Sequence, residues 1–170
     1  MPSIFNLFFM KAELMGESMK NNENGSPPKS GWSKLVPELM VKDLEISRGF
    51  WCDMLGFTVC YQRPEQFFCY LERPEGGQIM LSQFSRQWNV EQEDVPFGLG
   101  TMFQVTVDDL MHIHDRLKAA DWPLDRELSE VWRRLGDREG GRLEIMVRDP
   151  NGYYVMIAQD LGQRALSAQD

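Results

Sequence analysis

The sequence has little histidine and cysteine, the residue types that most often build metal and redox centres. Its 170 residues include two His and three Cys, and no two of the cysteines form a CxxC pair. Such a pair is a common sequence sign of a zinc site or a thioredoxin-like redox centre. The odd count, from Cys52, Cys60 and Cys69, argues against a disulfide framework and favours a reducing compartment. We therefore expect a cytoplasmic protein.

The two histidines are badly spaced for holding one metal ion. His112 and His114 lie in a stretch with helical periodicity, where residues two apart point about 200° away from each other. A chelating pair on a helix needs a spacing of four, as in the H-E-x-x-H motif. We interpret both histidines as solvated or packed side chains, and we expect neither a metal ion nor a cofactor.

Long hydrophobic runs and positive charge are scarce as well. The apolar start at residues 4–10 is too short to span a membrane, and its flanks lack the features of a signal peptide. The chain has 18 Lys and Arg against 26 Asp and Glu, a formal net charge of -8, which repels nucleic-acid phosphates. We expect neither a membrane nor a nucleic acid as partner. The acidic surface would attract a cationic small molecule, or it serves solubility alone.

Short motifs of common enzyme classes are missing too. The chain contains no G-x-S-x-G elbow, no P-loop and no dinucleotide-binding fingerprint. Its Gly76-Gly77 and Gly140-Gly141 pairs fit hairpin turns better than phosphate-binding loops. These motifs therefore point to no catalytic residue.

What the chain does have is an internal repeat. Residues 39–44, LMVKDL, and residues 105–110, VTVDDL, each fit a strand that ends in an Asp able to cap a helix. Gly56 and Pro123 mark where the two following helices end. Apolar residues recur at the spacing of one helix face in both copies, at Ile46, Phe50 and Met54 and at Leu110, Ile113, Leu117 and Ala120.

Short strand-like runs separated by turn residues follow each helix. Asp149-Pro150-Asn151-Gly152 is a strong turn signal between two of these runs. The pattern predicts an α+β fold of two βαβββ modules, at about residues 35–83 and 100–160. The expected strands after the helices lie near residues 58–62, 67–72, 78–83, 131–136, 142–148 and 153–159.

The ends of the chain differ in composition from the modules. Residues 11–34 are polar and rich in Gly, Pro, Asn and Ser, which is typical of a flexible segment. We therefore expect a flexible N-terminal arm at residues 1–34, a folded domain at residues 35–162, and a short C-terminal tail at residues 163–170.

Two groups of these residues resemble a known family. Residues 36–39, VPEL, and residues 50–57, FWCDMLGF, are similar to the opening of bleomycin resistance proteins, and residues 148–152, RDPNG, to their ending. The likeness covers about residues 35–162. LGF and DPNG are typical of the wider vicinal-oxygen-chelate superfamily, which includes glyoxalases, fosfomycin-modifying enzymes and ring-cleaving dioxygenases. The resemblance implies that each βαβββ module forms half of an open barrel.

The resemblance also implies a homodimer with two ligand grooves between the chains. In the resistance proteins, an early proline marks where the first strand leaves to exchange with the partner, and Pro37 matches that position. The alternative is a proline near the start of an edge strand, where no ladder hydrogen bond is lost. Both interpretations of Pro37 remain open at this point.

Metal-dependent relatives carry His, Gln or Glu near the start of the first strand and on the fourth strand of each module. The matching positions in this chain lack nitrogen and oxygen ligands, and a divalent cation gains nothing useful from valine, leucine or thioether groups. These positions hold Val36, Leu81 with Met80 beside it, Met102 and Met156. The family's usual chelate is therefore expected to be absent.

Aromatic side chains hold the drug's flat tail in the resistance proteins. Tyr61, four residues after Phe57, matches an aromatic position of that clamp, and Phe67 and Phe68 straddle the next one. Since neighbouring strand residues point to opposite faces, we expect one of these two phenylalanines in the groove and the other in the core. Each ring could also serve packing alone.

Two tryptophans complete the predicted ligand-binding set. Trp88 lies in a polar linker where a core role is hard to imagine, and Trp132 precedes two arginines. We predict that both stack on a planar ligand, while acidic residues of the linker attract its charge or simply form a solvated loop. Those acidic residues are Glu91, Glu93 and Asp94.

The sequence thus predicts a metal-free binding protein that sequesters a bleomycin-like or other flat cationic molecule and so confers antibiotic resistance. A metal-dependent lyase or dioxygenase of the glyoxalase type is the alternative. A metal-free enzyme with Glu38 or Glu144 as base is a third possibility. Residues 138–141, REGG, lack the family's tryptophan before the penultimate strand, which favours a ligand other than bleomycin itself.

Overall fold

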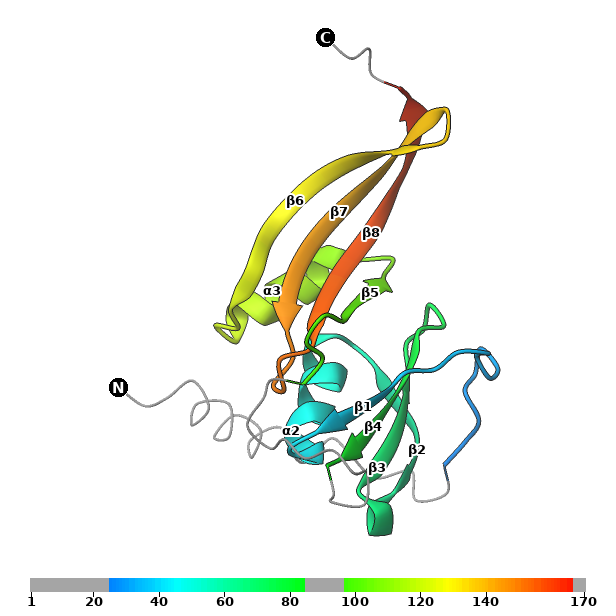
Figure 1. The fold of residues 1–170 in the computed structure, drawn as a ribbon, viewed down its shortest axis with the longest axis vertical. Coiled ribbons are helices and arrows are strands. Elements are labelled where there is room, and N and C mark those ends of the chain that lie inside the picture. The colour runs from blue at the N-terminus through cyan, green and yellow to red at the C-terminus, as the bar shows by residue number, and fades with distance from the viewer. Residues whose placement is uncertain (1–24, 85–96, 167–170) are drawn as a thin grey trace.

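The computed structural model describes residues 25–84 and 97–166, and within them two four-stranded sheets lie on either side of the helices (Figure 1). The first module runs β1 (Glu38–Val41), α2 (Leu44–Gly49), the π-helical η1 (Phe50–Met54), β2 (Thr58–Arg63), the 3₁₀ turn η2 (Pro64–Gln66), β3 (Phe68–Glu72) and β4 (Gln78–Gln83). The second runs β5 (Met102–Thr106), α3 (Leu110–Ala119), β6 (Leu124–Leu135), β7 (Arg138–Arg148) and β8 (Tyr154–Ala165). No helix of these residues is long and apolar enough to cross a membrane.

Both sheets repeat one topology. Sheet A has the order β1-β4-β3-β2 and sheet B the order β5-β8-β7-β6. In each sheet the first strand of the module pairs in parallel with the fourth, and the other pairs are antiparallel. The predicted α+β fold of two βαβββ modules is therefore confirmed. Within this single chain β1 pairs with its own β4 and forms an edge of sheet A. Pro37 directly precedes this edge strand, a position that suits a proline.

Strands of the second module are longer than the sequence pattern indicated. β6 begins at Leu124 instead of near residue 131, and β8 continues to Ala165 instead of residue 159. The register between β6 and β7 shifts twice between Leu124 and Ser129, so the alternation of apolar and polar residues is broken there. Beyond α3 these strands project as a curved three-stranded arm (Figure 1).

Both helices begin at the predicted aspartates, but the first buries a different set of residues than expected. The side chain of Asp43 accepts a hydrogen bond from the backbone N–H of Ile46 at 3.0 Å, and that of Asp109 accepts one from His112 at 3.1 Å. The π-helical turn η1 then rotates the following side chains relative to an α-helix. In place of a row at Ile46, Phe50 and Met54, the buried positions are Leu44, Ser47, Phe50, Trp51 and Leu55.

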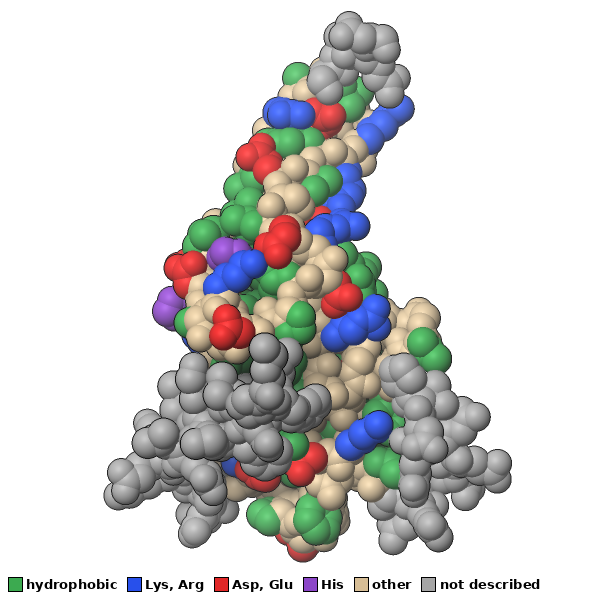
Figure 2. All heavy atoms as spheres, turned by 90° about the vertical axis from the view of Figure 1, so that its left-hand side faces the viewer, with side chains coloured by type: hydrophobic (Ala, Val, Ile, Leu, Met, Phe, Trp, Pro, Cys, Tyr) green, Lys and Arg blue, Asp and Glu red, His purple; other side chains and the backbone are tan. Residues whose placement is uncertain are grey.

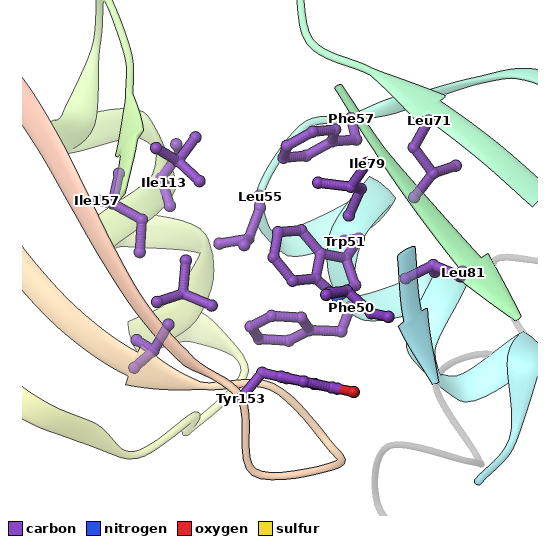
Figure 3. Close-up of a cluster of buried hydrophobic side chains, with 14 of the residues drawn as sticks. Phe50, Trp51, Leu55, Phe57, Leu71, Ile79, Leu81, Ile113, Tyr153 and Ile157 are labelled. Carbon is purple, nitrogen blue, oxygen red and sulfur yellow. The ribbon is translucent and has the colours of Figure 1, made fainter. Parts of the chain in front are cut away.

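A single hydrophobic core joins the two modules. Figure 3 shows Phe50, Trp51 and Leu55 between side chains of sheet A, such as Leu71, and side chains of the second module, such as Ile157. All five are fully buried, and each such side chain contributes about 1.5–3 kcal/mol by leaving water. The inner faces of both sheets are therefore occupied by packing.

The predicted turn at residues 149–152 ties the second module to the first. Its Asp149 carboxylate accepts hydrogen bonds from the backbone of Asn151 at 2.8 Å and of Tyr153 at 2.9 Å. The Asn151 side chain accepts from the backbone of Lys42 at 2.8 Å and donates to the Ser47 hydroxyl at 2.9 Å. Burial, despite these hydrogen bonds, raises the pKa of Asp149. This turn has a structural role in addition to reversing the chain.

Candidate ligand-binding site

The outer face of sheet A carries a group of aromatic rings. Along β3, Cys69 and Leu71 point into the core, so Phe68 and Tyr70 point outward. Tyr61 on β2 stacks on Tyr70 with ring centroids 5.3 Å apart and lies 5.8 Å from Phe68. We call Tyr61, Phe68 and Tyr70 the aromatic face. Phe68 and Tyr70 are each 3% exposed and Tyr61 is partly buried, so other groups of the chain cover most of this flat, apolar surface.

Phe67 lies beside this face without joining it. It follows η2 in a left-handed conformation with φ 49°, and its side chain is 57% exposed. The Arg63 guanidinium lies 3.9 Å from the centroid of the Phe68 ring. Phe68 is therefore already engaged by a cation of the chain, whereas Phe67 projects into solvent.

Two carboxylates lie on the same outer face, Glu72 beyond Tyr70 on β3 and Glu38 on β1, level with Tyr70 and separated from it by Met80 of β4. Glu38 on β1 accepts a hydrogen bond from the Ser82 hydroxyl, and Ser82 pairs with Phe68 across β3 and β4. Glu72 ends β3, two residues beyond Tyr70, and is buried. Burial alone would raise the pKa of Glu72, but hydrogen bonds from Ser30 and Lys29 outweigh it and lower that pKa. The carboxylate is thus ionised at neutral pH.

Residues 25–34, which we call the strap, lie across this end of sheet A. The Trp32 ring contacts Tyr70 and Tyr61 edge-on, with centroids 5.3 Å and 6.1 Å away. The strap belongs to the part of the chain that the sequence pattern assigned to a flexible arm. Residues 1–24 of that arm lie outside the described residues.

The outer face of sheet B has a different character. Glu144 on β7 is fully buried, and both carboxylate oxygens bind the guanidinium of Arg133, one of them at 2.9 Å. Arg126 lies 3.9 Å away, and Met146 and Met156 pair beside it on the same face. Figure 2 shows Lys and Arg side chains along one edge of the projecting arm, with hydrophobic side chains next to them. This face is cationic and rich in methionine.

Glu38 and Glu144, the two candidate catalytic bases, do not have the surroundings of a catalytic base. The hydrogen bonds from Arg133, acting against burial, lower the pKa of Glu144, which makes it a weaker proton acceptor. Glu38 is exposed and hydrogen-bonded to Ser82. Catalytic bases commonly have a raised pKa, so the ion pair of Glu144 supports a structural role.

The structure brings together two of the five predicted ligand-binding residues, Tyr61 and Phe68, with Phe67 beside them. Trp132 lies in sheet B, opposite Gly141, on the side of the arm away from Glu144. Its indole donates to Glu130 at 2.6 Å, and the Arg164 guanidinium lies 4.0 Å from its ring centroid. Trp88 lies outside the described residues, as do Glu91, Glu93 and Asp94.

Sequence reasoning missed three residues of this site: Trp32, Tyr70 and Glu72. Tyr70 and Glu72 follow Phe68 at a spacing of two, so strand alternation from Phe68 places all three on one face. Trp32 is an isolated tryptophan in a polar segment, the same signal that singled out Trp88. The signals were present, but the segment around Trp32 was assigned to a flexible arm.

The positions compared with metal ligands hold apolar groups in the structure. Met80 and Met156 pair with outward-facing residues, and Val36 packs against the aromatic face. Leu81 points into the core. Across residues 25–84 and 97–166, no group of three His, Cys, Asp or Glu side chains is arranged to hold a metal ion.

Comparison with known proteins gives one family and a set of structural likenesses. The model of the glyoxalase/bleomycin resistance protein/dioxygenase superfamily matches residues 35–157. No curated protein matches the chain significantly. A solved superfamily member from Vibrio splendidus 12B01 is 31% identical over 74% of this chain and 97% of that chain, with a TM-score of 0.35.

Two further solved structures are similar at lower identity. TioX from Micromonospora sp. ML1 is 19% identical, with 76% of this chain and 100% of that chain covered and a TM-score of 0.57. A lactoylglutathione lyase from Agrobacterium tumefaciens is 18% identical, with coverages of 75% and 94% and a TM-score of 0.49. At such identities the likeness to TioX concerns the fold alone, and the likeness to the lyase is too low to support an argument.

Proposed function

Because the chain belongs to the glyoxalase/bleomycin resistance protein/dioxygenase superfamily, we propose that it is a cytoplasmic, metal-free binding protein that sequesters a flat, cationic small molecule. The observation that carries the proposal is the aromatic face of sheet A, where three rings share one outer face with Glu38 and Glu72. Tight binding of an antibiotic of the bleomycin kind would confer resistance without any reaction.

The chemistry of this face suits such a ligand. A planar ring stacked on Tyr61 or Tyr70 gains about 0.5–1.5 kcal/mol beyond the area it buries. A positive group on the ligand would have the exposed Glu38 beside the rings, and the ionised Glu72 once Lys29 and Ser30 no longer bind it. Arg63 already lies over Phe68, so we expect the ligand's ring to lie on Tyr61 and Tyr70. The positive group of the ligand is expected to point away from the Arg63 guanidinium.

We further propose that two copies associate, with the outer face of sheet A in one copy opposite the outer face of sheet B in the other. Sheet B offers two large exposed apolar side chains on that face, Met102 and Leu135, at 51% and 57% exposure. Burying them would favour association. Light scattering on the purified protein should give the mass of a dimer, and Met102→Glu should shift it toward the monomer.

Phe67 remains a proposed secondary contact of the ligand, and Trp132, which lies on the side of sheet B away from Glu144, belongs to the proposal on the sequence argument. Phe67 is exposed beside Phe68 and can reach a ligand without rearrangement of the sheet. Trp132 is already held by Glu130 and Arg164, so its replacement by Ala is expected to weaken ligand binding less than replacement of Tyr61. Trp88 belongs to the proposal on the sequence argument alone.

The test is a calorimetric titration of metal-stripped protein with metal-free bleomycin, together with elemental analysis of the untreated protein. We expect one ligand per chain and no stoichiometric metal. Tyr61→Leu should weaken binding about three- to tenfold, the equivalent of one lost ring contact. Met111→Ala, on the exposed side of α3, is the matched control and should leave the affinity unchanged.

The opposite result would point to the alternative function. If bleomycin fails to bind and the untreated protein holds one divalent ion per chain, the sequestration proposal is wrong. A metal-dependent enzyme of the glyoxalase or dioxygenase type would then be the better hypothesis. If bleomycin binds but Tyr61→Leu binds as tightly as the unaltered chain, the ligand lies elsewhere on the molecule.

A further inference from the structure

The strap is fixed at its start to β2, one of the two edge strands of sheet A. The backbone N–H of Ser26 donates to the carbonyl of Cys60 at 2.8 Å. Gly25 lies so close to Tyr61 that a Cβ atom on it would come within 2.3 Å of the tyrosine Cβ. A residue with a side chain therefore cannot occupy position 25 while the strap lies on the sheet.

The middle of the strap binds the Glu72 carboxylate. Residues 28–31 form a turn closed by a hydrogen bond from Gly31 N–H to the carbonyl of Pro28 at 3.0 Å. The turn directs the backbone N–H groups of Lys29 and Ser30 at the two carboxylate oxygens, at 2.8 and 2.9 Å, and the Ser30 hydroxyl donates there as well. Three donors thus converge on one acidic group.

The end of the strap binds Gln78 and the aromatic face. The Gln78 amide donates to the carbonyl of Gly31 at 2.6 Å, and its oxygen accepts from Ser33 N–H at 3.0 Å and from the Tyr70 hydroxyl at 2.6 Å. The Trp32 ring then meets the rings of Tyr61 and Tyr70. The strap therefore engages the rings and the carboxylate that a ligand of the aromatic face would need.

The strap is held by polar contacts more than by burial. Of its ten residues only Pro28 is buried, and Trp32 is 55% exposed. Ordering ten residues costs conformational entropy that a few net hydrogen bonds barely offset. A segment held in this way can leave the sheet without disturbing the core between the modules, because no strap residue belongs to that cluster. Its departure would expose Tyr70 of the smaller cluster on the outer face, which is 3% exposed beneath it.

We propose that the strap occupies the aromatic face as an internal ligand, and that a small molecule binds this face by displacing it. The inference rests on the proposed function in taking this face as the ligand site. The contacts of the strap also define the ligand class. A displacing molecule has a flat aromatic ring for the two tyrosines, N–H donors or positive charge for Glu72, and a carbonyl acceptor for the Gln78 amide.

Strap variants that leave the aromatic face intact provide the test. Trp32→Ala removes the ring contact, and Gly25→Ala forces the start of the strap away from Tyr61. Gly100→Ala is the matched control, since Gly100 also has a positive φ, +77°, but has nothing within 4 Å of an added Cβ. All variants are made in the full chain.

The first measurement is hydrogen–deuterium exchange, which needs no ligand. The amides of Lys29 and Ser30 should exchange about tenfold faster in both strap variants than in the unaltered chain or in Gly100→Ala, while amides of β3 and β4 keep their rates. Unchanged exchange at Lys29 and Ser30 would mean that the strap is not held by these contacts, and would overturn the proposal.

The second measurement is fluorescence titration with proflavine, a flat aromatic cation with N–H donors, and with metal-free bleomycin. Removing a competing closed state raises the apparent affinity by the reciprocal of the open fraction, so a strap that is open about a tenth of the time predicts that both strap variants bind proflavine about tenfold more tightly than the unaltered chain. Saturating proflavine should also speed exchange at Lys29 and Ser30 of the unaltered chain. Equal proflavine affinity, or no proflavine binding, in variants whose strap has opened would overturn the proposal.

The bleomycin titration separates this inference from the proposed function. If the strap variants gain affinity for proflavine but no protein binds bleomycin, the strap is an internal ligand and the bleomycin-like sequestration is wrong. If bleomycin binds with the same affinity to all variants and proflavine does too, sequestration stands and the strap is a structural element only.

Discussion

The two sheets share one topology, yet their outer faces differ in chemistry. Sheet A presents rings and the carboxylate of Glu72 beneath the strap, whereas sheet B presents Arg126 and Arg133 around the buried Glu144. Their inner faces are alike, since both send aliphatic side chains into one core. The comparison teaches that a repeated strand order constrains the buried side of a sheet and leaves the chemistry of the other side free.

The largest expected effect comes from breaking the core that makes the inner faces one unit. Trp51 is fully buried between the modules, and its indole donates to Asp149 at 3.4 Å. Trp51→Ala should lower the free energy of unfolding by about 3–5 kcal/mol. Urea unfolding followed by circular dichroism and by fluorescence should still give one coincident transition. Two separate transitions would show that the modules fold independently.

The next effect tests the ion pair that distinguishes sheet B. Arg133→Met leaves the buried Glu144 with Arg126 alone, at 3.9 Å. Since the Arg133 side chain is half exposed, the usual cost of breaking a buried pair is discounted to about 2 kcal/mol. Arg126→Met, the matched control, should cost no more than about 0.5 kcal/mol in the same urea unfolding at pH 7. Equal losses for the two variants would contradict this account.

A smaller effect concerns the acid sensitivity of the strap on sheet A. The folded chain lowers the pKa of Glu72 because the strap's hydrogen bonds outweigh burial, so the fold favours the ionised carboxylate. The resulting stability is fully present above the ordinary value of 4.5 and is lost as pH falls below it. Exchange protection of Lys29 and Ser30, corrected for intrinsic rates, should therefore be constant from pH 7 to pH 5 and decrease as the pH falls below 4.5.

Glu72→Gln sharpens this comparison because the amide has the same shape and does not titrate. Protection at Lys29 and Ser30 should already be low at pH 7 in this variant and should change little on acidification. The neighbouring Cys60, whose Sγ lies 3.8 Å from the Glu72 carboxylate, stays protonated throughout, because burial raises its pKa to about 11. Strong acid dependence in Glu72→Gln would assign the effect to another group.

The smallest expected effect is at Phe67, beside the aromatic face. Its φ of 49° is the left-handed conformation that a bulky residue adopts at a cost. Phe67→Asn should therefore raise the free energy of unfolding by about 0.5–1 kcal/mol, since asparagine tolerates this conformation and little buried surface is lost. Phe67→Ala is the control and should stay within about 0.5 kcal/mol of the unaltered chain. A loss above that range would show that the Phe67 ring has a packing role.

The amino-acid pattern was sufficient to predict the order of elements, both helix caps and the turn at residues 149–152. Each of these depends on local chemistry: an Asp that accepts a backbone hydrogen bond, a period of 3.6 or 2, and turn residues that tolerate unusual backbone angles. Part of the aromatic face, Tyr61 and Phe68, was also accessible through the resemblance to the family. The full length of β6 was not, because its shifts in register remove the alternation that signals a strand.

What only the tertiary structure decided is which surfaces meet. The π-helical turn of η1 changes the buried face of the first helix, because its hydrogen bonds span a wider turn than an α-helix does. The strap is polar and looks flexible by composition, yet Glu72 and Gln78, more than forty residues away, fix it on the sheet. Such contacts depend on distances through space between residues far apart along the chain, and no local pattern records them.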